Sequence, residues 1–415
     1  MVRSRKSPEL LLPAGNFEKM KAALRFGADA VYLAGKRFGM RAAADNFDLS
    51  ELEDALKYAH GLSKKVYLTV NITPHVYEYA DLEKFFSDLS ELSEKPDALI
   101  IADPGVFMLA GKLLPSVERH VSTQAGAVSD RDCMFWHEMG ASRVVIAREL
   151  TLREIQEIRR LIPETLELET FVHGSMCVSF SGRCLLSEHF IGRDGNRGAC
   201  AQPCRWEYNL YELSEVKRPE MRMPIEETDR GSFIMSSKDM CTIEHIPELC
   251  ESGISSFKIE GRMKSAYYCA VTANTYRMAI DRYLADPQGY SFDPSFMREL
   301  ESVTHREYCS GYYFDDPPRN GQLVTKGGYL CEKSYLATVV SYDAASGRAT
   351  LMQKNKLCNG DACELLTPGS VGIGFVAHDL QDESGEPIES APHPYQIFSI
   401  KTDLPMHAGD IIRSK

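Results

Sequence analysis

The first two-thirds of the chain alternates between two kinds of segment, and this alternation limits the possible folds more than any other feature. Short apolar runs rich in Val, Ile and Leu recur as ELLLPAG, AVYLAG, KVYLTVN, ALIIAD, RHVSTQ, RVVIARE, LELETFVHG and SSFKIEGR. Segments of helical periodicity, such as NFEKMKAALRFGA and LSELEDALKYAHGL, separate most of these runs. Apolar strands that alternate with amphipathic helices are typical of a parallel sheet covered by helices.

Eight strands spread over roughly 280 residues fit an α/β fold of the (β/α)8 type, a TIM-like barrel. An open, doubly wound sheet is the alternative. Against it, LPAGNF after the first strand lacks the G-x-G-x-x-G pattern that binds dinucleotide phosphates. We therefore predict a barrel in residues 1–285.

The chain changes character after Tyr283. Residues 286–328 mix a helical segment with proline-rich connections and are predicted to form a linker. From residue 329 to 415, short alternating strands broken at ASGR and NGD predict an all-β module, a small β-barrel. The sequence thus indicates two globular parts joined by a connecting segment.

A long insertion separates the seventh and eighth predicted strands, at about residues 174–233. It carries four of the chain's 12 cysteines in the spacing C-x6-C-x15-C-x3-C, namely Cys177, Cys184, Cys200 and Cys204. An iron–sulfur cluster accepts such irregular loops, whereas zinc usually binds paired, closely spaced cysteines, which only the second pair resembles. Unliganded or redox-active thiols are the third possibility, and Cys241 in SSKDMC is a rival fourth ligand.

Polar residues follow the predicted strands at their carboxyl ends, the face where barrel enzymes carry out their chemistry. They are Asn71, Asp103, Gln124, Arg148, Glu149, His173 and the trio Lys258, Glu260 and Arg262. The trio alternates along one strand, so its three side chains are expected to share a face. Burying that much charge requires partners or an anionic ligand.

Composition narrows the class of protein. With 44% hydrophobic and 26% charged residues, the chain is typical of a globular protein. No run of about 18 apolar residues occurs, and Leu10–Leu12 is too short for a signal-peptide core, so we expect no membrane span and a cytoplasmic location. Reducing conditions favour ligand or catalytic roles for clustered cysteines over disulfides. The net charge of −12 argues against bulk polyanion binding but permits a local basic patch.

The cysteine block is also the most specific part of a family resemblance. The segments ETFVHGSMCVSFSGRCLLS, GRDGNRGACAQPCRWEY, SSKDM and FKIEGRMKS resemble the collagenase-like peptidase family U32, as do the opening LLLPAGNFEKMKAALRFGADAVYLAG and FGMRAAADNF. The resemblance covers nearly the whole chain. Bacterial members of this family hydroxylate tRNA, ribosomal RNA or ubiquinone precursors. The length and the C-terminal extension of this chain are most similar to those of the tRNA-hydroxylating members.

The resemblance implies a cofactor and a reaction. Hydroxylating members hold a [4Fe–4S] cluster on four cysteines; Cys177, Cys184 and Cys200 match the first three positions, and Cys204 is the best match for the variable fourth. The tRNA-hydroxylating members convert the wobble uridine to 5-hydroxyuridine in a reaction linked to prephenate rather than to molecular oxygen. The implied partners are therefore tRNA, prephenate and an electron donor protein. Members with the C-terminal extension fold it like a translation-factor barrel, which fits RNA docking, although a role in stability alone stays open.

Roles for individual residues follow as a hypothesis. A flipped-out base must enter the barrel mouth, because its C5 atom is otherwise stacked. The candidates are Lys258, Arg262 and Arg41 for binding the carboxylates of prephenate, Gln124 at the same face, Glu260 and His173 for acid–base chemistry, and Trp206 with Tyr208 for stacking the base.

Proteolysis is the main alternative. The chain contains neither a G-x-S-x-G nor an H-E-x-x-H sequence. A cysteine protease needs one activated thiol beside a histidine, and Cys177 with His173 is the pair that proximity in sequence suggests. Hydroxylation of ribosomal RNA or of a ubiquinone precursor is the other alternative.

Overall fold

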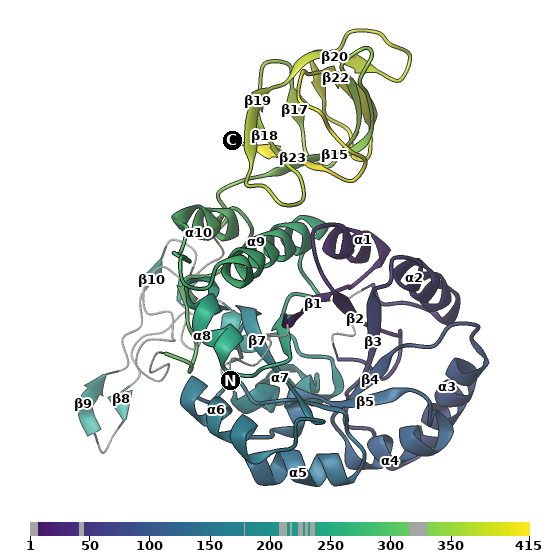
Figure 1. The fold of residues 1–415 in the computed structure, drawn as a ribbon, viewed down its shortest axis with the longest axis vertical. Helices are drawn as coiled ribbons and strands as arrows, with labels where there is room; N and C mark the ends of the chain where they lie inside the picture. The colour runs from purple at the N-terminus through teal and green to yellow at the C-terminus, as the bar shows by residue number, and fades with distance from the viewer. Residues whose placement is uncertain are drawn as a thin grey trace. The chain divides into compact units, whose positions relative to one another are not determined.

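The computed structural model of the chain describes residues 7–40, 45–177, 179–206, 214–215, 218–222, 227–228, 231–232, 237–314 and 330–415 (Figure 1). This part of the chain divides into two compact units. The first comprises the described residues of Met1–Met20, Asp29–Met263 and His305–Tyr329. The second comprises Lys21–Ala28, Lys264–Thr304 and Leu330–Lys415.

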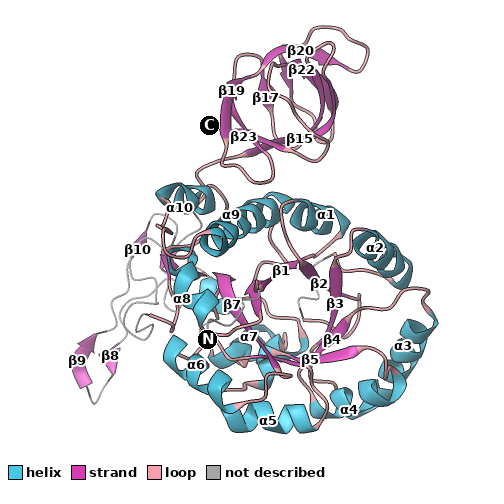
Figure 2. Ribbon diagram, in the orientation of Figure 1, coloured by secondary structure: helices cyan, strands magenta, loops and turns pink. Residues whose placement is uncertain are grey.

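A closed barrel of eight parallel strands forms the centre of the first unit (Figures 1 and 2). The strands are β1 (Glu9–Pro13), β2 (Ala30–Ala34), β3 (Lys65–Val70), β4 (Ala98–Ile101), β5 (Glu118–Val121), β6 (Arg143–Val145), β7 (Glu167–Ser175) and β13 (Ser256–Ile259). Strand β13 pairs in parallel with both β1 and β7, which closes the ring. The predicted (β/α)8 barrel is thereby confirmed, and the open sheet is excluded.

Helices surround this barrel, as Figure 2 shows. They include α2 (Leu49–Gly61), α3 (Tyr79–Glu91), α4 (Pro104–Leu113), α5 (Asp130–Glu138), α6 (Leu152–Leu161) and α8 (Ile246–Glu251). Helix α6 shows how the sequence specifies such a helix. Thr151 and Glu154 form a capping box at its start, and Leu152, Ile155 and Ile158 form its buried face. Helix α1 (Phe17–Arg25) follows β1, and α9 (Ala266–Ala285) follows β13.

The barrel interior contains charge as well as apolar side chains. Leu11, Ala30, Tyr32, Tyr67, Ala98 and Ile100 form one buried cluster. Arg143 on β6 reaches Glu9 on β1, with a distance of 2.6 Å between Nη1 and Oε1. Because β6 and β1 are not neighbours in the ring, this contact crosses the interior. Most TIM barrels fill this space with branched apolar residues, so the ion pairs here are unusual.

The predicted insertion lies between β7 and β13 and is confirmed. Its described residues include the short helix α7 (Leu186–Ile191), two small hairpins, and a strand that extends the barrel sheet. The hairpins are β8 (Ser214–Glu215) with β9 (Arg218–Arg222), and β10 (Glu227–Thr228) with β11 (Gly231–Ser232). Strand β12 (Asp239–Cys241) pairs antiparallel with β7, and β14 (Tyr308–Cys309) pairs with β12. Part of the range predicted as linker, 286–328, thus joins the barrel sheet, while α10 (Pro294–Glu301) belongs to the second unit.

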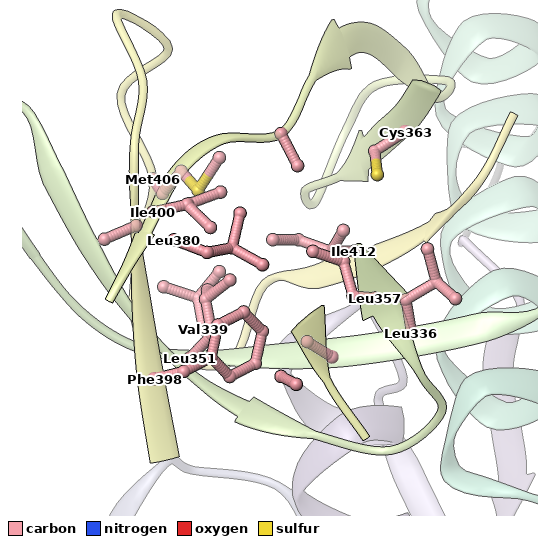
Figure 3. Packing of buried hydrophobic residues seen from close by; sticks show 14 of the residues in the cluster. Leu336, Val339, Leu351, Leu357, Cys363, Leu380, Phe398, Ile400, Met406 and Ile412 are labelled. Atoms are coloured by element: carbon pink, nitrogen blue, oxygen red, sulfur yellow. The ribbon is translucent and has the colours of Figure 1, made fainter. Parts of the chain in front are cut away.

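The C-terminal region of the second unit is an antiparallel all-β half-barrel, which confirms the predicted β module. Its main sheet has the order β19-β18-β23-β15-β16-β22-β20. The strands are β15 (Tyr335–Asp343), β16 (Arg348–Gln353), β17 (Leu357–Cys358), β18 (Ala362–Leu366), β19 (Ile373–Val376), β20 (His378–Asp382), β21 (Ser390–Ala391), β22 (Ile397–Lys401) and β23 (Ile411–Ser414). Alternate residues of β16 are buried, and Figure 3 shows Leu351 packing with Val339 and Phe398 in the core.

One buried arginine joins this β region to the helices of the same unit. Arg413 on β23 is 1% exposed and donates to Glu299 of α10 and to the Tyr267 hydroxyl of α9. Burial alone would lower the pKa of Arg413, but the hydrogen bonds and charge interactions with Glu299 and Tyr267 together outweigh burial and raise it.

The helices in the described ranges are all too short or too polar to cross a membrane.

Candidate active site

A cavity of about 140 Å³ lies at the carboxyl ends of the barrel strands, where the cysteine-rich insertion meets them. Figure 1 draws α7 of the insertion over the ring of strands, and Leu186 of α7 lines the cavity with barrel residues. The full lining is Tyr32, Met40, Thr69, Asn71, Ile100, Thr123, Gln124, Arg148, Phe171, Cys177, Ser181, Cys184, Leu186, Gly195, Cys200, Pro203, Cys204, Lys258, Glu260 and Arg262. This is the barrel face at which enzymes of this fold place their chemistry.

Most of the candidate residues meet in this cavity. They are Cys177, Cys184, Cys200, Cys204, Gln124, Lys258, Glu260 and Arg262. His173 and Trp206 are described but do not line the cavity. Arg41 and Tyr208 lie outside the described residues.

The cysteine-rich loop is held by carboxylates from other elements. Glu149 accepts hydrogen bonds from the Ser181 backbone N–H at 2.5 Å and from its hydroxyl at 2.8 Å. These bonds stabilise Ser181 at φ 44°, a left-handed conformation that few residues other than glycine adopt. Arg197 forms a two-pronged ion pair with Glu78, with both N–O distances at 2.7 Å. Hydrogen bonding to Arg197 lowers the pKa of Glu78 to about 2. The loop is therefore anchored at two points.

Backbone N–H groups contact the sulfur atoms of Cys184 and Cys200. The Leu186 N–H lies 3.4 Å from Cys184 Sγ, and the Gln202 N–H lies 3.3 Å from Cys200 Sγ. Such bonds stabilise thiolates and are one of the ways proteins tune iron–sulfur clusters. Within the described ranges, no three His, Cys, Asp or Glu side chains are grouped closely enough to ligate one metal ion. The four thiols thus line one cavity, but no three of them lie close enough together to ligate one metal ion.

The structure separates the two candidates for a fourth cysteine. Cys204 follows Pro203 in a short helical turn and lines the cavity. Cys241 lies on β12, opposite His173 of β7, and is 7% exposed. It is outside the set of residues that line the cavity. Cys204 is therefore the cysteine that shares a space with the other three.

Lys258 is paired inside the barrel. Its ammonium lies 2.7 Å from Glu169 Oε1 and 4.6 Å from the centre of the Tyr32 ring. Glu169 is fully buried and also accepts from Arg143 at 3.0 Å. Burial alone would raise the pKa of Glu169, but the charges of Lys258 and Arg143 outweigh it and lower that pKa to about 2. The charge of Lys258 is thus compensated by Glu169, which does not line the cavity.

Glu260 and Arg262 follow β13 rather than lying within it. The pairing of β13 with β7 shifts register between Lys258 and Ile259, where the strand ends. All three members of the trio still line the cavity. Tyr32 donates its hydroxyl hydrogen to Glu260 Oε2 at 3.2 Å, and Arg262, 3% exposed, donates to Thr69 Oγ1 at 3.1 Å.

Gly174 on β7 allows the backbone of Glu260 to pack closely against β7. Gly174 has φ +108°, which side-chain-bearing residues rarely adopt. A Cβ atom at this position would lie 2.2 Å from the carbonyl oxygen of Glu260. The position of Glu260 therefore depends on a residue without a side chain at 174.

Arg148 is a cavity residue to which the sequence assigned no role. It follows β6, donates to the Ser175 carbonyl at 2.9 Å, and places its guanidinium 4.9 Å from the centre of the Phe171 ring. No carboxylate among the described residues forms an ion pair with it. Its place at a strand end was visible in the sequence, but the lack of an acidic partner was not.

His173 and Trp206 lie elsewhere. The His173 ring is buried and lies 5.3 Å from the ring of Tyr308, which stacks on His305 at 4.4 Å. The Trp206 indole donates to the Ala201 carbonyl at 3.1 Å and so braces the cysteine-rich loop. The acid–base and stacking roles proposed from the sequence for these two residues therefore gain no geometric support.

Comparison with protein families identifies the family of this chain. The family model described as peptidase family U32 matches residues 15–323, and that of the U32 C-terminal domain matches residues 332–413. The chain belongs to peptidase family U32. The resemblance inferred from the cysteine block is confirmed, together with the C-terminal extension.

Relatives in this family have different names. The chain is 36% identical over 408 residues to tRNA hydroxylation protein P1 of Bacillus subtilis, covering 98% of this chain and 95% of the relative. It is 34% identical to the 23S rRNA 5-hydroxycytidine C2501 synthase of Escherichia coli, covering 91% of this chain and 55% of that protein. It is 30% identical to a protein called collagenase from Porphyromonas gingivalis, covering 87% and 86%.

The ion pairs of Glu169 with Lys258 and Arg143 predict how the stability of the protein depends on pH. In Glu169→Gln, Lys258 and Arg143 lose their shared carboxylate, so we expect the free energy of unfolding to fall by about 3–5 kcal/mol at neutral pH. The folded-state pKa of Glu169 is below its ordinary value of 4.5. Its contribution is therefore complete above that pH and is lost as the pH falls towards 2. Urea unfolding of both proteins should show their difference shrinking over this range.

The matched control is Glu157→Gln, which removes an exposed ion pair with Arg160 on α6. This substitution should change stability little at any pH. A difference between Glu169→Gln and wild type that stays constant down to low pH would contradict the assignment of charge to Glu169.

Proposed function

We propose that this protein hydroxylates tRNA, converting the wobble uridine to 5-hydroxyuridine with prephenate as co-substrate and a [4Fe–4S] cluster on its four clustered cysteines. One observation carries the proposal: a single cavity brings together four thiols, an aromatic and apolar wall, and several cations. The names of two relatives support RNA hydroxylation, and one of them specifies the 5 position of a pyrimidine.

The side chains that line the cavity favour an aromatic ring. Tyr32, Ile100 and Phe171 provide apolar and aromatic contacts, while Thr69 and Asn71 offer polar groups to ring substituents. These features suit a pyrimidine base flipped out of its strand. An extended peptide needs a longer groove, and His173, the suggested partner of a Cys177 nucleophile, lies outside the cavity.

The cysteine donors fit an iron–sulfur cluster. Cys177, Cys184, Cys200 and Cys204 would hold it, since all four line one cavity and two of them already accept backbone N–H bonds. When bound, the cluster supplies one-electron transfer beside the base. The irregular spacing and the N–H···S bonds agree better with this group than with tetrahedral zinc.

The anionic co-substrate would bind to the arginines. Lys258 already forms an ion pair with Glu169, so its ammonium attracts the carboxylate of a ligand less strongly than an unpaired cation would. Arg148 has no ion-pair partner among the described residues, and Arg262 is buried at the cavity wall. Both guanidinium groups can bind a carboxylate through two parallel hydrogen bonds. We therefore assign the carboxylates of prephenate to Arg148 and Arg262.

Glu260 is the base that the geometry favours. Hydroxylation at C5 of uridine is a two-electron oxidation, so the co-substrate must give up a hydroxyl group, take up the electron pair and gain a hydrogen in its place, while C5 loses its hydrogen as a proton. Glu260 is a carboxylate in the cavity, and the Tyr32 hydroxyl orients its Oε2 atom. Accepting the proton of C5 is the role we assign to it. Gln124, whose buried Oε1 atom has no hydrogen-bond partner in the described structure, can accept an N–H of the base.

The reaction itself is tested in the cell. Deletion of the gene should remove 5-hydroxyuridine and modifications derived from it from tRNA, and a plasmid copy should restore them. Mass spectrometry of tRNA nucleosides measures this, with 5-hydroxycytidine in ribosomal RNA followed as a second substrate. Unchanged tRNA in the deletion strain would refute the proposed substrate. Cleavage of gelatin by the purified protein would favour the peptidase instead.

The cluster is tested by metal analysis. Anaerobically purified protein should contain iron and acid-labile sulfide and should absorb broadly in the visible range. Cys204→Ala should lose both iron and colour, because Cys204 lines the cavity. Cys241→Ala is the matched control and should keep iron and colour. Cys133→Ala, at a buried residue of α5, should keep them as well. Stoichiometric zinc without sulfide would contradict the cluster.

The anion site is tested by separating binding from stability. Arg262→Lys and Arg148→Lys keep the charge but lose the planar fork, so KM for prephenate should rise about ten-fold or more while urea unfolding changes little. Lys258→Met should instead lose roughly 3–5 kcal/mol of stability, because Glu169 loses a buried partner. If Lys258→Met raised KM at full stability while the arginine variants did not, our assignment would be reversed.

A further inference from the structure

The loop that carries Cys184 has an outer surface as well as an inner one. Ser181 and Cys184 line the cavity. Their neighbours Phe180 and Arg183 point away from it: Phe180 is 48% exposed, and Arg183 is exposed as well. One short segment therefore contributes to the cavity wall and, one residue away, to the surface beside the cavity.

Phe180 and Arg183 lie next to each other on that surface. A Cβ atom placed on Gly126 would be 3.5 Å from Phe180 Cε1 and 3.8 Å from Arg183 Cζ. The Arg183 guanidinium is fixed by hydrogen bonds of 2.8 and 3.0 Å to the Gln124 carbonyl and of 3.0 Å to the Ala125 carbonyl. Gln124 itself lines the cavity. An exposed aromatic ring and an immobilised cation thus border the cavity together.

The charge of this region differs from that of the whole chain. Residues 179–206 contain four arginines and two carboxylate side chains, in a chain of net charge −12. Arg197 is paired with Glu78. Arg183 and Arg193, by contrast, donate to backbone carbonyls, and neither has a carboxylate partner in the described ranges. Their positive charge is therefore available to an anionic partner.

We propose that Phe180 and Arg183 bind the nucleotide adjacent to the one in the cavity, within a single-stranded stretch of RNA. The Phe180 ring would stack on the base, and Arg183 would bind the phosphate. A base that leaves its stack to enter the cavity deprives the adjacent base of a stacking partner, so that base gains from a new stacking surface. Aromatic rings beside cations are the usual surfaces for unpaired bases. This inference rests on the proposed function and adds the surface by which RNA is held.

The test uses the full-length protein and a synthetic RNA hairpin with uridine in a single-stranded loop. Phe180→Ala should weaken binding about ten-fold, because one stacking contact is lost. Phe135→Ala removes an equally exposed ring, 52% exposed, from α5 on the barrel exterior and should bind like wild type. Fluorescence anisotropy measures the dissociation constants, and melting temperatures confirm that the variants are folded.

Salt dependence tests the arginine separately from its structural role. Arg183→Gln should reduce the slope of log K against log salt by about 0.7, the value for one phosphate contact on a single strand. Arg183→Lys keeps the charge and should keep the slope, even though the hydrogen bonds to the two carbonyls change. Arg131→Gln, at a side chain 90% exposed on α5, is the control and should leave the slope unchanged.

The outcomes separate this inference from the proposed function. If the gene is required for 5-hydroxyuridine and yet Phe180→Ala and Arg183→Gln bind the hairpin like wild type, the inference is overturned and the function stands. If deletion leaves tRNA unchanged, the function fails first. Variants that bind RNA normally but no longer accept electrons from a donor protein would assign this surface to a protein partner and overturn the inference too.

Discussion

The barrel is organised around one buried carboxylate. Glu169 is fully buried and pairs with both Lys258, which lines the cavity, and Arg143, which also pairs with Glu9 across the ring. An unpaired charge in this interior would be very costly, so each member fixes the others in position. Lys258 of the cavity wall is therefore part of the ion-pair network that links β1, β6, β7 and β13. The geometry of the site depends on these ion pairs inside the barrel.

This arrangement decides which cations can serve a ligand. Glu169 compensates Lys258 internally, and Glu260 is the carboxylate among the cavity-lining residues. Arg148 and Arg262 both add positive charge to the cavity wall. Positive surroundings favour thiolate over thiol and also attract carboxylates. In the function that we propose, the same two guanidinium groups would favour both the thiolate form of the cysteines and the binding of an anionic co-substrate.

The sequence predicted the barrel, the insertion and the cysteine set because each depends on local pattern: apolar runs, their spacing, and the separation of four thiols. Other features required the pairing of distant residues. Glu169 looked like an ordinary polar residue in LELETFVHG, since its partners on β6 and β13 are far away in sequence. His173 looked like a strand-end site residue, but β7 continues to Ser175 and β12 pairs alongside it. Arg148 could be placed at a strand end, but no sequence pattern showed that it forms no ion pair with a carboxylate of the described residues.

The position of the insertion has a consequence for how the protein is made. Closing the ring requires β13 to meet β1, and the Ser256 hydroxyl donates to Glu9 across 247 positions of sequence. Contacts so distant form late, because much chain must be ordered first. During synthesis from the N-terminus, all four cysteines leave the ribosome before Lys258, Glu260 and Arg262 exist as chain. The cysteine-rich segment is therefore complete while the ring is still open, and the order of residues separates synthesis of the thiols from completion of the cavity that they line.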